Sequence, residues 1–482
     1  MDCRRRILRN RIVHRNNERI RSPVKSSKLD RFLCLFTDVH AGEGVTALLM
    51  FANVFLILCA YYFIKPLREG WIAVSDISGL TKMEVKAYSS FGQSLLFILV
   101  VWFYGRLSDR WRRSDLITRS TIFCISNLAV FWAIQPGLFI ENLPYTGIVF
   151  YLWVGMFGVF MVAQFWAFAA DLYTKERGHR LFPLIAIGAT AGAACGSWIT
   201  GALVDFGLFG TQWLLIVAMI PLAASIALSK ISDRRKPDQS VRTEAASETG
   251  FEDSGRSAIA IVFASRFLIA VAGITLLLSW VNTNGENLLF RVVQEFLTGD
   301  ALKEGITQSD ALLVFTRDGT TAFYGDFYFW VNIAALLLQA FVASRLLKFG
   351  GFGVILLTMP VVALISYTAM AFVPILAIVK AMKIVENSTD YSINNTARNV
   401  LWLPVSAEMK YKGKPTIDSL CVRIGDGIAA LTVLVGVQFL ALSTQSFFVL
   451  NVALVLIWIA FAFVVIREHR RLSGDKGVAR KG

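Results

Sequence analysis

The sequence predicts an all-α membrane protein with twelve transmembrane helices arranged in two six-helix halves. This prediction rests on the composition, on the spacing of apolar segments and on the distribution of positive charge. The chain has 482 residues, of which 55% are hydrophobic and only 17% are charged, whereas an ordinary soluble domain has about 25% charged residues. A chain this apolar is typical of a polytopic membrane protein.

Apolar runs long enough to cross a bilayer, about 17 to 25 residues, recur in two sets of six. The first set comprises 46–64, 84–104, 116–135, 146–170, 181–204 and 212–229, and the second comprises 267–285, 323–347, 352–373, 374–396, 416–442 and 446–466. We therefore expect an N-terminal half over 46–229 and a C-terminal half over 258–466. Between them, 230–257 is polar and has no apolar period, which predicts a solvated cytoplasmic linker.

The distribution of positive charge predicts the orientation of the chain. Loops after even-numbered spans are rich in Lys and Arg, whereas most loops after odd-numbered spans carry almost none. By the positive-inside rule, both termini are cytoplasmic, with a basic arm over 1–45 and a basic tail over 467–482. Because the arm lacks the amphipathic pattern and cleavage signal of a transit peptide, we expect it to contact anionic lipid. A bacterial inner membrane is therefore favoured over a plastid envelope.

A stripe of polar and charged residues interrupts the tenth predicted span. At about 100° per residue, its members fit within a helical arc of roughly 80°. Each charge at mid-bilayer costs about 2.5 to 3.5 kcal/mol on insertion scales, so the stripe is expected to face an aqueous cavity or partner charges. This predicts a solute pathway along Lys380, Lys383, Asn387, Asp390, Asn394 and Arg398, with Glu386 beside them.

Further cations are candidates for contact with a solute. Lys65 and Arg68 lie one turn apart at the expected end of the first span, where Pro66 is expected to disturb the helix. They either face the solute or extend to the interface, and the spacing favours neither. In the eleventh span, the Arg423 guanidinium can bind phosphate or carboxylate through two hydrogen bonds. The predicted substrate-binding set is Lys65, Arg68, Lys380, Lys383, Asn387 and Arg423.

Four carboxylates are predicted to balance these cations or to carry a coupling proton. Glu286 follows the expected seventh span and Asp326 opens the eighth, which places both near the non-cytoplasmic mouth. Asp390 lies on the stripe and Asp426 lies in the eleventh span. Ordinary ion pairing at the interface is the competing explanation for Glu286 and Asp326.

The loop after the second span carries a recognisable pattern. The segment GRLSDRWRR, 105–113, resembles the cytoplasmic loop signature of the major facilitator superfamily. Gly105 permits a tight turn, and Asp109 can cap the next helix or pair with an arginine such as Arg113 in one gating state. We therefore predict a gating role for these three residues and a fold of the major-facilitator type.

A weak internal repeat supports two parallel halves. At an offset of 235 residues, Gly178 coincides with Gly413 and Gly192 with Gly427. The matched segments enter the fifth and eleventh spans, as expected of a transporter with its site between two related halves. In the fifth span, small residues at intervals of four form a ridge on which another helix can pack closely. The glycines of this ridge are Gly188, Gly192 and Gly196.

The sequence carries no enzyme or metal-site signature. It contains no phosphate-binding loop, no HExxH and no GxSxG, and its four histidines lie outside the predicted spans. The six cysteines show no CxxC spacing, so we expect small buried hydrophobes rather than metal ligands or disulfides. We expect no cofactor, a monomer in the lipid bilayer, and a small anionic substrate. The net charge of +14 reflects topology, not a nucleic-acid partner.

Four segments resemble the ATP/ADP translocase family of intracellular bacteria and plastids, together with its bacterial relatives. They are AYYFIKPLRE (60–69), FWAFAADLYTKERGHRLFPLIAIGATAG (165–192), FYGDF (323–327) and MKYKGKPTIDSLCVRIGDG (409–427). The resemblance spans nearly the whole chain. It implies a fold similar to the major facilitator fold and an antiporter that exchanges nucleotides or related anions at a cationic central site.

Individual positions match this family only in part. Arg68 resembles the lysine of the first span in nucleotide-exchanging members, and Glu286 resembles their acidic residue in the seventh. In contrast, 146–170 contains no acidic residue, whereas the nucleotide exchangers have one in the fourth span, and Asp426 stands where they have a lysine in the eleventh. The resemblance therefore implies the fold of the family more directly than it implies the family's substrate.

These observations predict a transporter that moves an anionic, nucleotide-like or phosphorylated solute by alternating-access exchange. One alternative is a proton-coupled carrier of another polar solute, in which Glu386, Asp390 or Asp426 titrates. A second alternative is a membrane sensor or assembly protein of the same fold that no longer transports. Counterflow and the effect of replacing Arg68 or Lys380 distinguish the three.

Overall fold

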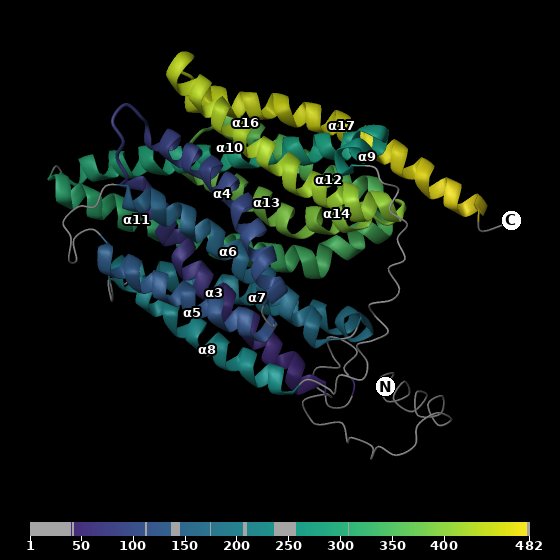
Figure 1. Ribbon diagram of the computed structural model, residues 1–482. Helices are drawn as coiled ribbons and strands as arrows, with labels where there is room; N and C mark the ends of the chain where they lie inside the picture. The colour runs from purple at the N-terminus through teal and green to yellow at the C-terminus, as the bar shows by residue number, and fades with distance from the viewer. Residues whose placement is uncertain are drawn as a thin grey trace.

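The computed structural model describes residues 40, 43–110, 113–135, 145–173, 175–205, 210–235, 257–306 and 308–479. This part of the chain is helical and contains no strand. Figure 1 shows two groups of roughly antiparallel helices that lie side by side. The group at the bottom of the view comes from the N-terminal part of the chain, and the group at the top comes from the C-terminal part. The α+β and all-β classes are therefore excluded for the described residues.

Each predicted apolar run coincides with a helix. In the N-terminal half these are α3 (Gly44–Ala73), α4 (Lys82–Arg110), α5 (Arg113–Ile134), α6 (Thr146–Leu172), α7 (Lys175–Asp205) and α8 (Leu214–Arg234), with a 3-10 turn η2 (Thr211–Trp213) before α8. In the C-terminal half the long helices are α10 (Arg266–Lys303), α11 (Ser309–Leu337), α12 (Ser344–Phe372) and α17 (Thr444–Ala479). The short helix α9 (Ala258–Ala264) precedes α10.

The tenth and eleventh runs are each built from several helical pieces. The tenth comprises α13 (Leu376–Thr389), a π turn η5 (Asp390–Asn394) and α14 (Asn395–Leu401). The eleventh comprises η6 (Met409–Gly413), α15 (Lys414–Thr416), η7 (Ile417–Cys421), α16 (Val422–Leu434) and η8 (Val435–Phe439), of which all three η pieces are π turns. Such π turns shift the helical phase and are frequent at functional sites.

Nine helical segments of the described residues are long and apolar enough to cross a membrane. One of them, Ser309–Phe372, contains both the eighth and the ninth predicted spans. A π turn η4 (Leu338–Ala343) lies within the eighth of these spans, and a kink at Gly351, whose φ of +68° favours glycine, separates the eighth from the ninth. The expected spans outside these nine are α4 and α13, and the charged stripe lowers the hydropathy of α13. The count of twelve therefore remains a prediction.

Three helices extend beyond the limits that hydropathy predicts. The helix α10 continues to Lys303 and α11 begins at Ser309, so Glu286 and Asp326 lie within long helices. They are therefore not at helix ends, and their place near the non-cytoplasmic mouth remains a prediction. Likewise α3 continues through Pro66 to Ala73, so the expected break there is absent. Hydropathy ends a span at polar residues, but these polar groups are satisfied by protein partners and the helix continues.

The ridge of small residues in α7 packs against α3, as predicted. A Cβ atom placed on Gly192 would lie 2.2 Å from the backbone oxygen of Phe55, and one on Gly196 would lie 2.4 Å from that of Cys59. Only glycine permits this approach of two backbones. Cys59 and Cys124 are buried and free, as expected of small hydrophobic residues.

The two halves contact one another mainly toward the turn between α10 and α11. A Cβ atom on Gly325 of α11 would lie 2.9 Å from the backbone nitrogen of Gly201 in α7. Nearer the same end, Thr211 donates a hydrogen bond of 2.7 Å to Asp318. In Figure 1 the two groups of helices diverge toward the opposite end, where α8 and α17 finish. The molecule is therefore closed at the end that the charge pattern predicts to be non-cytoplasmic.

Candidate functional site

Lys65 lies where the two halves meet, among the rings of three tyrosines. Its ammonium is 3.8 Å from the ring centroid of Tyr328, 4.9 Å from that of Tyr62 and 5.9 Å from that of Tyr61. The residue is 9% exposed. Because Tyr328 belongs to α11 and Lys65 to α3, this cation–π contact joins the halves. Cation–π contacts supply part of the stabilisation that a buried ammonium loses with its hydration shell.

Arg68 lies one turn further along α3 and is paired with a carboxylate. Its Nη2 is 2.6 Å from Glu69 Oε1, and its guanidinium carbon lies 4.4 Å from the ring centroid of Tyr151. The second oxygen of Glu69 is 2.9 Å from the ammonium of Lys86 in α4. All three charged residues are buried. The pairs hold α3 and α4 together and neutralise Arg68 in this conformation.

Lys86 connects this cluster to the C-terminal half. Its ammonium donates to the backbone oxygen of Glu286 at 3.3 Å and to the Tyr324 hydroxyl at 3.4 Å, and it lies 4.6 Å from the ring centroid of Phe290. The acceptors lie on α10 and α11. A cation of the N-terminal half thus binds two helices of the other half, and these contacts must break if the halves separate.

Lys383 lies at the centre of a second, fully buried cluster. Its ammonium is 2.8 Å from Glu386 Oε2 and 3.4 Å from Glu286 Oε1, and the side chain is 0% exposed. Asn387 donates to Glu286 at 2.9 Å, and the Tyr367 hydroxyl donates to Glu386 at 2.9 Å. The cluster joins α10, α12 and α13. Two carboxylates with one ammonium place excess negative charge here, offset by neutral donors.

Lys380 pairs with Asp326 in a more accessible position. The Lys380 ammonium is 2.5 Å from Asp326 Oδ2, and the two side chains are 30% and 43% exposed. The ammonium also lies 5.2 Å from the ring centroid of Phe323. This pair connects α13 to α11. Because both partners contact solvent, an incoming anion can compete with Asp326 for Lys380 more easily than it can reach Lys383.

The remaining residues of the stripe have different partners before and after the π turn η5. Asp390 accepts a hydrogen bond of 2.6 Å from Asn394 and has no ion-pair partner among the described residues. Beyond the turn, Arg398 is paired with Asp418 at 2.8 Å. The π turn changes the helical phase, so the stripe is not one continuous lining. Lys380, Lys383 and Asn387 contact the α10 and α11 carboxylates, whereas Arg398 contacts the eleventh predicted span.

Arg423 and Asp426 form an inter-half contact with α4. Arg423 Nη1 donates to Ser94 at 2.9 Å, and it is 3.4 Å from Asp426 Oδ2. Asp426 also accepts from Ser94 at 2.5 Å, from Ser279 at 2.9 Å and from Thr283 at 2.8 Å. The carboxylate is therefore fully used by hydroxyl donors and by its own arginine. This geometry makes Asp426 a structural acceptor in the closed conformation.

The predicted gating residues are only partly covered by the structure. Gly105 and Asp109 lie in the last turns of α4, and Arg113 begins α5. Their side chains lie outside the described residues, as does 111–112. Their gating role therefore remains a prediction.

Sequence analysis missed three residues of this site. Glu69 and Lys86 lie near the edges of apolar runs, where charges are common. Tyr328 lies within a span, where an aromatic residue is usually part of the core. A search for the partner of each buried cation would have found Glu69, which adjoins Arg68 in the sequence. Nothing in the sequence pairs Glu69 with Lys86 or places Tyr328 over Lys65.

Taken together, the cations of the site are almost all neutralised. Arg68, Lys86, Lys380 and Lys383 each lie within ion-pair distance of a carboxylate. Lys65 has aromatic neighbours and no ion-pair partner in the part of the chain that the structure describes. The arrangement can therefore accept one negative charge at Lys65, and more only when ion pairs exchange partners.

Comparison with known proteins confirms the family resemblance. Residues 330–469 match the family model described as TLC ATP/ADP transporter. ADP,ATP carrier protein 1 of Chlamydia muridarum is 24% identical over 165 residues, which cover 30% of this chain and 31% of that protein. The protein of the same name from Chlamydia pneumoniae is 28% identical over 129 residues, covering 23% and 25%. The aligned region thus spans less than a third of either relative.

Solved structures confirm the fold. A mutant of the nucleoside transporter NupG superimposes with a TM-score of 0.58 at 14% identity, covering 87% of this chain and 99% of that one. A bacterial homologue of the human lysosomal transporter Spinster, in an inward-facing and unoccupied conformation, gives 0.55 at 16% identity over 89% and 98%. The human organic anion transporter MFSD10 gives 0.53 at 14% identity over 88% and 100%.

These matches establish the architecture. The protein is an all-helical integral membrane protein with a major-facilitator-type fold, as predicted. The relatives that match its sequence are named as carriers, not as enzymes. The family model covers the region that includes α13 and α16.

Proposed function

We propose that this protein is a membrane transporter, not an enzyme, that moves an anionic, nucleotide-like or phosphorylated solute by alternating-access exchange. The observation that carries the proposal is Lys65, a cation without an ion-pair partner among the described residues, located between the halves. The match to the ATP/ADP transporter model supports the nucleotide class. The carrier relatives support transport rather than sensing.

The solute is proposed to bind first at Lys65 and Lys380. Lys65 offers a charge with no carboxylate to displace, and Lys380 offers one whose partner Asp326 is accessible. A solute that contacts both lysines bridges α3 and α13, one helix from each half. Binding energy gained across the two halves can then favour the conformation in which they close around the solute.

The deeper ion pairs are proposed to change partners during the transport cycle. Arg68, Lys383 and Glu286 take part in pairs that tie the helices of the site together. Breaking a buried pair without a substitute partner is strongly destabilising, about 3 to 5 kcal/mol. Anionic solute supplies that substitute, so the loaded carrier crosses between conformations more readily than the empty one. This is the property that makes a carrier an exchanger.

Counterflow tests the proposal. Purified protein in liposomes loaded with unlabelled ATP is expected to accumulate external labelled ADP, ATP or another nucleotide without a pH gradient. Lys65→Gln is expected to abolish this accumulation, while Lys82→Gln, on a half-buried lysine at the start of α4 that pairs with the exposed Asp76, is expected to leave it intact. Absence of uptake and of binding for a panel of nucleotides, sugar phosphates and carboxylates would overturn the proposal.

A proton-coupled mechanism is the second candidate, and Asp390 favours it. This carboxylate accepts a hydrogen bond from Asn394 and has no ion-pair partner in the described residues. Accumulation that collapses with an uncoupler and is lost in Asp390→Asn supports symport. Uptake that persists in both cases supports exchange.

The orientation and assembly are also proposed. We infer that the protein resides in a bacterial inner membrane as a monomer, with both termini in the cytoplasm and the halves joined by the linker 230–257. The charge distribution supports this orientation. Reporter fusions at the two termini should both be active in the cytoplasm, and a reporter inserted between α10 and α11 should be active on the opposite side.

A further inference from the structure

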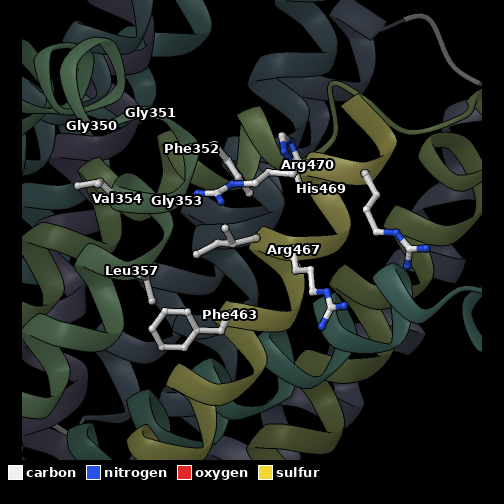
Figure 2. A pocket seen from close by; sticks show the side chains of 12 residues that line it. Gly350, Gly351, Phe352, Gly353, Val354, Leu357, Phe463, Arg467, His469 and Arg470 are labelled. Carbon is white, nitrogen blue, oxygen red and sulfur yellow. The ribbon is translucent and has the colours of Figure 1, made fainter. Parts of the chain in front are cut away.

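A cavity on the outer side of the C-terminal half lies apart from the proposed transport site. It has a volume of about 900 Å³ and lies between the first part of α12 and the end of α17 (Figure 2). Its walls include Gly353, Leu357, Phe463 and Ile466. None of its lining residues belongs to the clusters around Lys65 or Lys383. The transport mechanism leaves this cavity without a role.

The lower part of the cavity is apolar and accessible. Phe463 is 58% exposed and Val354 is 45% exposed. In a protein that crosses a membrane, exposed apolar side chains on the outer surface of the helices contact lipid chains. The cavity therefore opens toward the hydrocarbon region, not toward the space between the halves.

The upper rim of the cavity is strongly basic. Arg467 and Arg470 are exposed and have no acidic partner among the described residues, whereas Arg471 is 3.2 Å from Glu468. Figure 2 shows the Arg470 side chain extending toward Gly353. One of its Nη atoms is 4.0 Å from the position that a Cβ atom would take on Gly353. Both unpaired arginines line the cavity, but Figure 2 shows the Arg467 side chain directed away from Gly353, so the Arg470 guanidinium alone stands at the glycine-rich end.

An aromatic stack holds the basic rim of the cavity in place. His469 stacks on Phe352, with ring centroids 3.8 Å apart and an interplanar angle of 18°. The His469 Nε2 atom is buried and has no hydrogen-bond partner in the structure. Stacking joins the end of α17 to the glycine-rich kink at Gly351, where the backbone is close to the rim. The rim is therefore a built surface of two helices.

We propose that this cavity binds one anionic phospholipid, with its phosphate at Arg470 and an acyl chain along Leu357 and Phe463, while the charge of Arg467 adds to the attraction. Guanidinium groups bind phosphate oxygens through paired hydrogen bonds. Basic pockets between transmembrane helices on the cytoplasmic side suit anionic headgroups, because the attraction adds to the burial of the acyl chain. A soluble anion would bind the arginines but would not cover the apolar wall of the cavity.

Thermal unfolding of the full-length protein in neutral detergent tests this site. Phosphatidylglycerol is expected to raise the Tm, while phosphatidylcholine and soluble glycerol phosphate are not. In Arg467→Gln/Arg470→Gln, the phosphatidylglycerol concentration for half-maximal stabilisation is expected to rise about 30-fold, from about 1 kcal/mol for each arginine. The matched control is Arg234→Gln/Arg235→Gln, which removes two exposed arginines from the end of α8 and should respond like the parent protein.

Each other outcome overturns the proposal. An equal response in the parent protein and in Arg467→Gln/Arg470→Gln means that the lipid acts elsewhere. Equal stabilisation by phosphatidylcholine removes the role of charge, and equal stabilisation by glycerol phosphate identifies a soluble anion. If the glutamine variant does not fold, Arg467→Lys/Arg470→Lys keeps the charge and should keep the response. Native mass spectrometry should show one retained phosphatidylglycerol fewer in the glutamine variant than in the control.

Discussion

The ammonium of Lys65 lies 3.8 Å from the ring centroid of Tyr328, so a buried cation of one half is held by an aromatic face of the other. This contact differs from its neighbours in one respect. Arg68, Lys86, Lys380 and Lys383 are each neutralised by a carboxylate, and Lys65 is not. The following predictions depend on that difference and on the contacts that close the halves.

Replacing Lys65 should impair binding more than folding. Lys65→Gln removes a charge without leaving an unpaired carboxylate, so the Tm should change little. A hydrogen bond between charged groups contributes about 2 kcal/mol, and nucleotide binding should therefore weaken about 30-fold. Calorimetric titration and thermal unfolding of the same sample measure the two effects. Lys82→Gln is the control, and a large loss of stability with unchanged binding would contradict the prediction.

Replacing Lys383 should impair folding. Lys383→Met leaves the buried Glu386 without its ammonium partner, so the free energy of unfolding should fall by about 3 to 5 kcal/mol. In Lys383→Met/Glu386→Gln the unpaired charge is removed, and most of the loss should be recovered. Denaturant unfolding in detergent measures both variants. Lys303→Met, on an exposed lysine, should be neutral, and a double variant no more stable than the single one would refute the explanation.

Cross-linking the closed end of the molecule should stop exchange. Thr211 and Asp318 come from different halves and their side chains are joined by a hydrogen bond of 2.7 Å. In a background without native cysteines, Thr211→Cys/Asp318→Cys treated with a short bifunctional thiol reagent should lose counterflow. It should still bind nucleotide added on the cytoplasmic side. Each single-cysteine variant should be unaffected by the reagent, and full activity of the cross-linked protein would exclude opening at this end.

Stability at acid pH should depend on Glu43. Burial by itself would raise the pKa of Glu43, but hydrogen bonds from Arg180 and from the His40 backbone, together with the charge of Arg180, outweigh burial and lower the pKa below its ordinary value. A carboxylate with a lowered pKa stabilises the fold above its unfolded pKa of about 4.3, and this contribution is lost as pH falls through the folded pKa.

The Glu43→Gln variant tests this sign. Its Tm should be below that of the parent protein at pH 6, and the difference should shrink as the pH approaches 3. Glu304→Gln, on an exposed residue at the end of α10, is the control and should show no such trend. A difference that grows toward acid pH would show that the Glu43 carboxylate does not stabilise the folded state.

Much of the architecture could be predicted from local features of the sequence. The lengths of the apolar runs predicted where helices lie, because a bilayer demands about 20 apolar residues for each crossing. The ridge of Gly188, Gly192 and Gly196 predicted a close helix contact, because small residues at intervals of four align on one face. Predictions failed at helix ends. Glu286 and Asp326 seemed terminal by hydropathy, but α10 and α11 continue past them because both carboxylates have partners in the protein.

The pairing of the site could not be read from the chain. The sequence identified Lys383 and Glu386 as neighbours on a helix, but their other partners, Glu286 and Tyr367, come from distant segments. Glu69 and Lys86 are joined only when α3 packs on α4. The central site that the family resemblance implies to be cationic is less positive in the structure, because each of four cations is within reach of a carboxylate.

The sequence by itself determined that this is a helical membrane protein with charged groups inside it, and it predicted two related halves. Those properties follow from composition and periodicity, which act locally along the chain. Only the tertiary structure decided which of those charges are satisfied. The energy of a buried charge depends on the groups within a few ångströms of it, and packing chooses these groups from distant segments. Packing therefore gives the two lysines different environments: Lys65 has only aromatic partners, whereas Lys383 has two carboxylates.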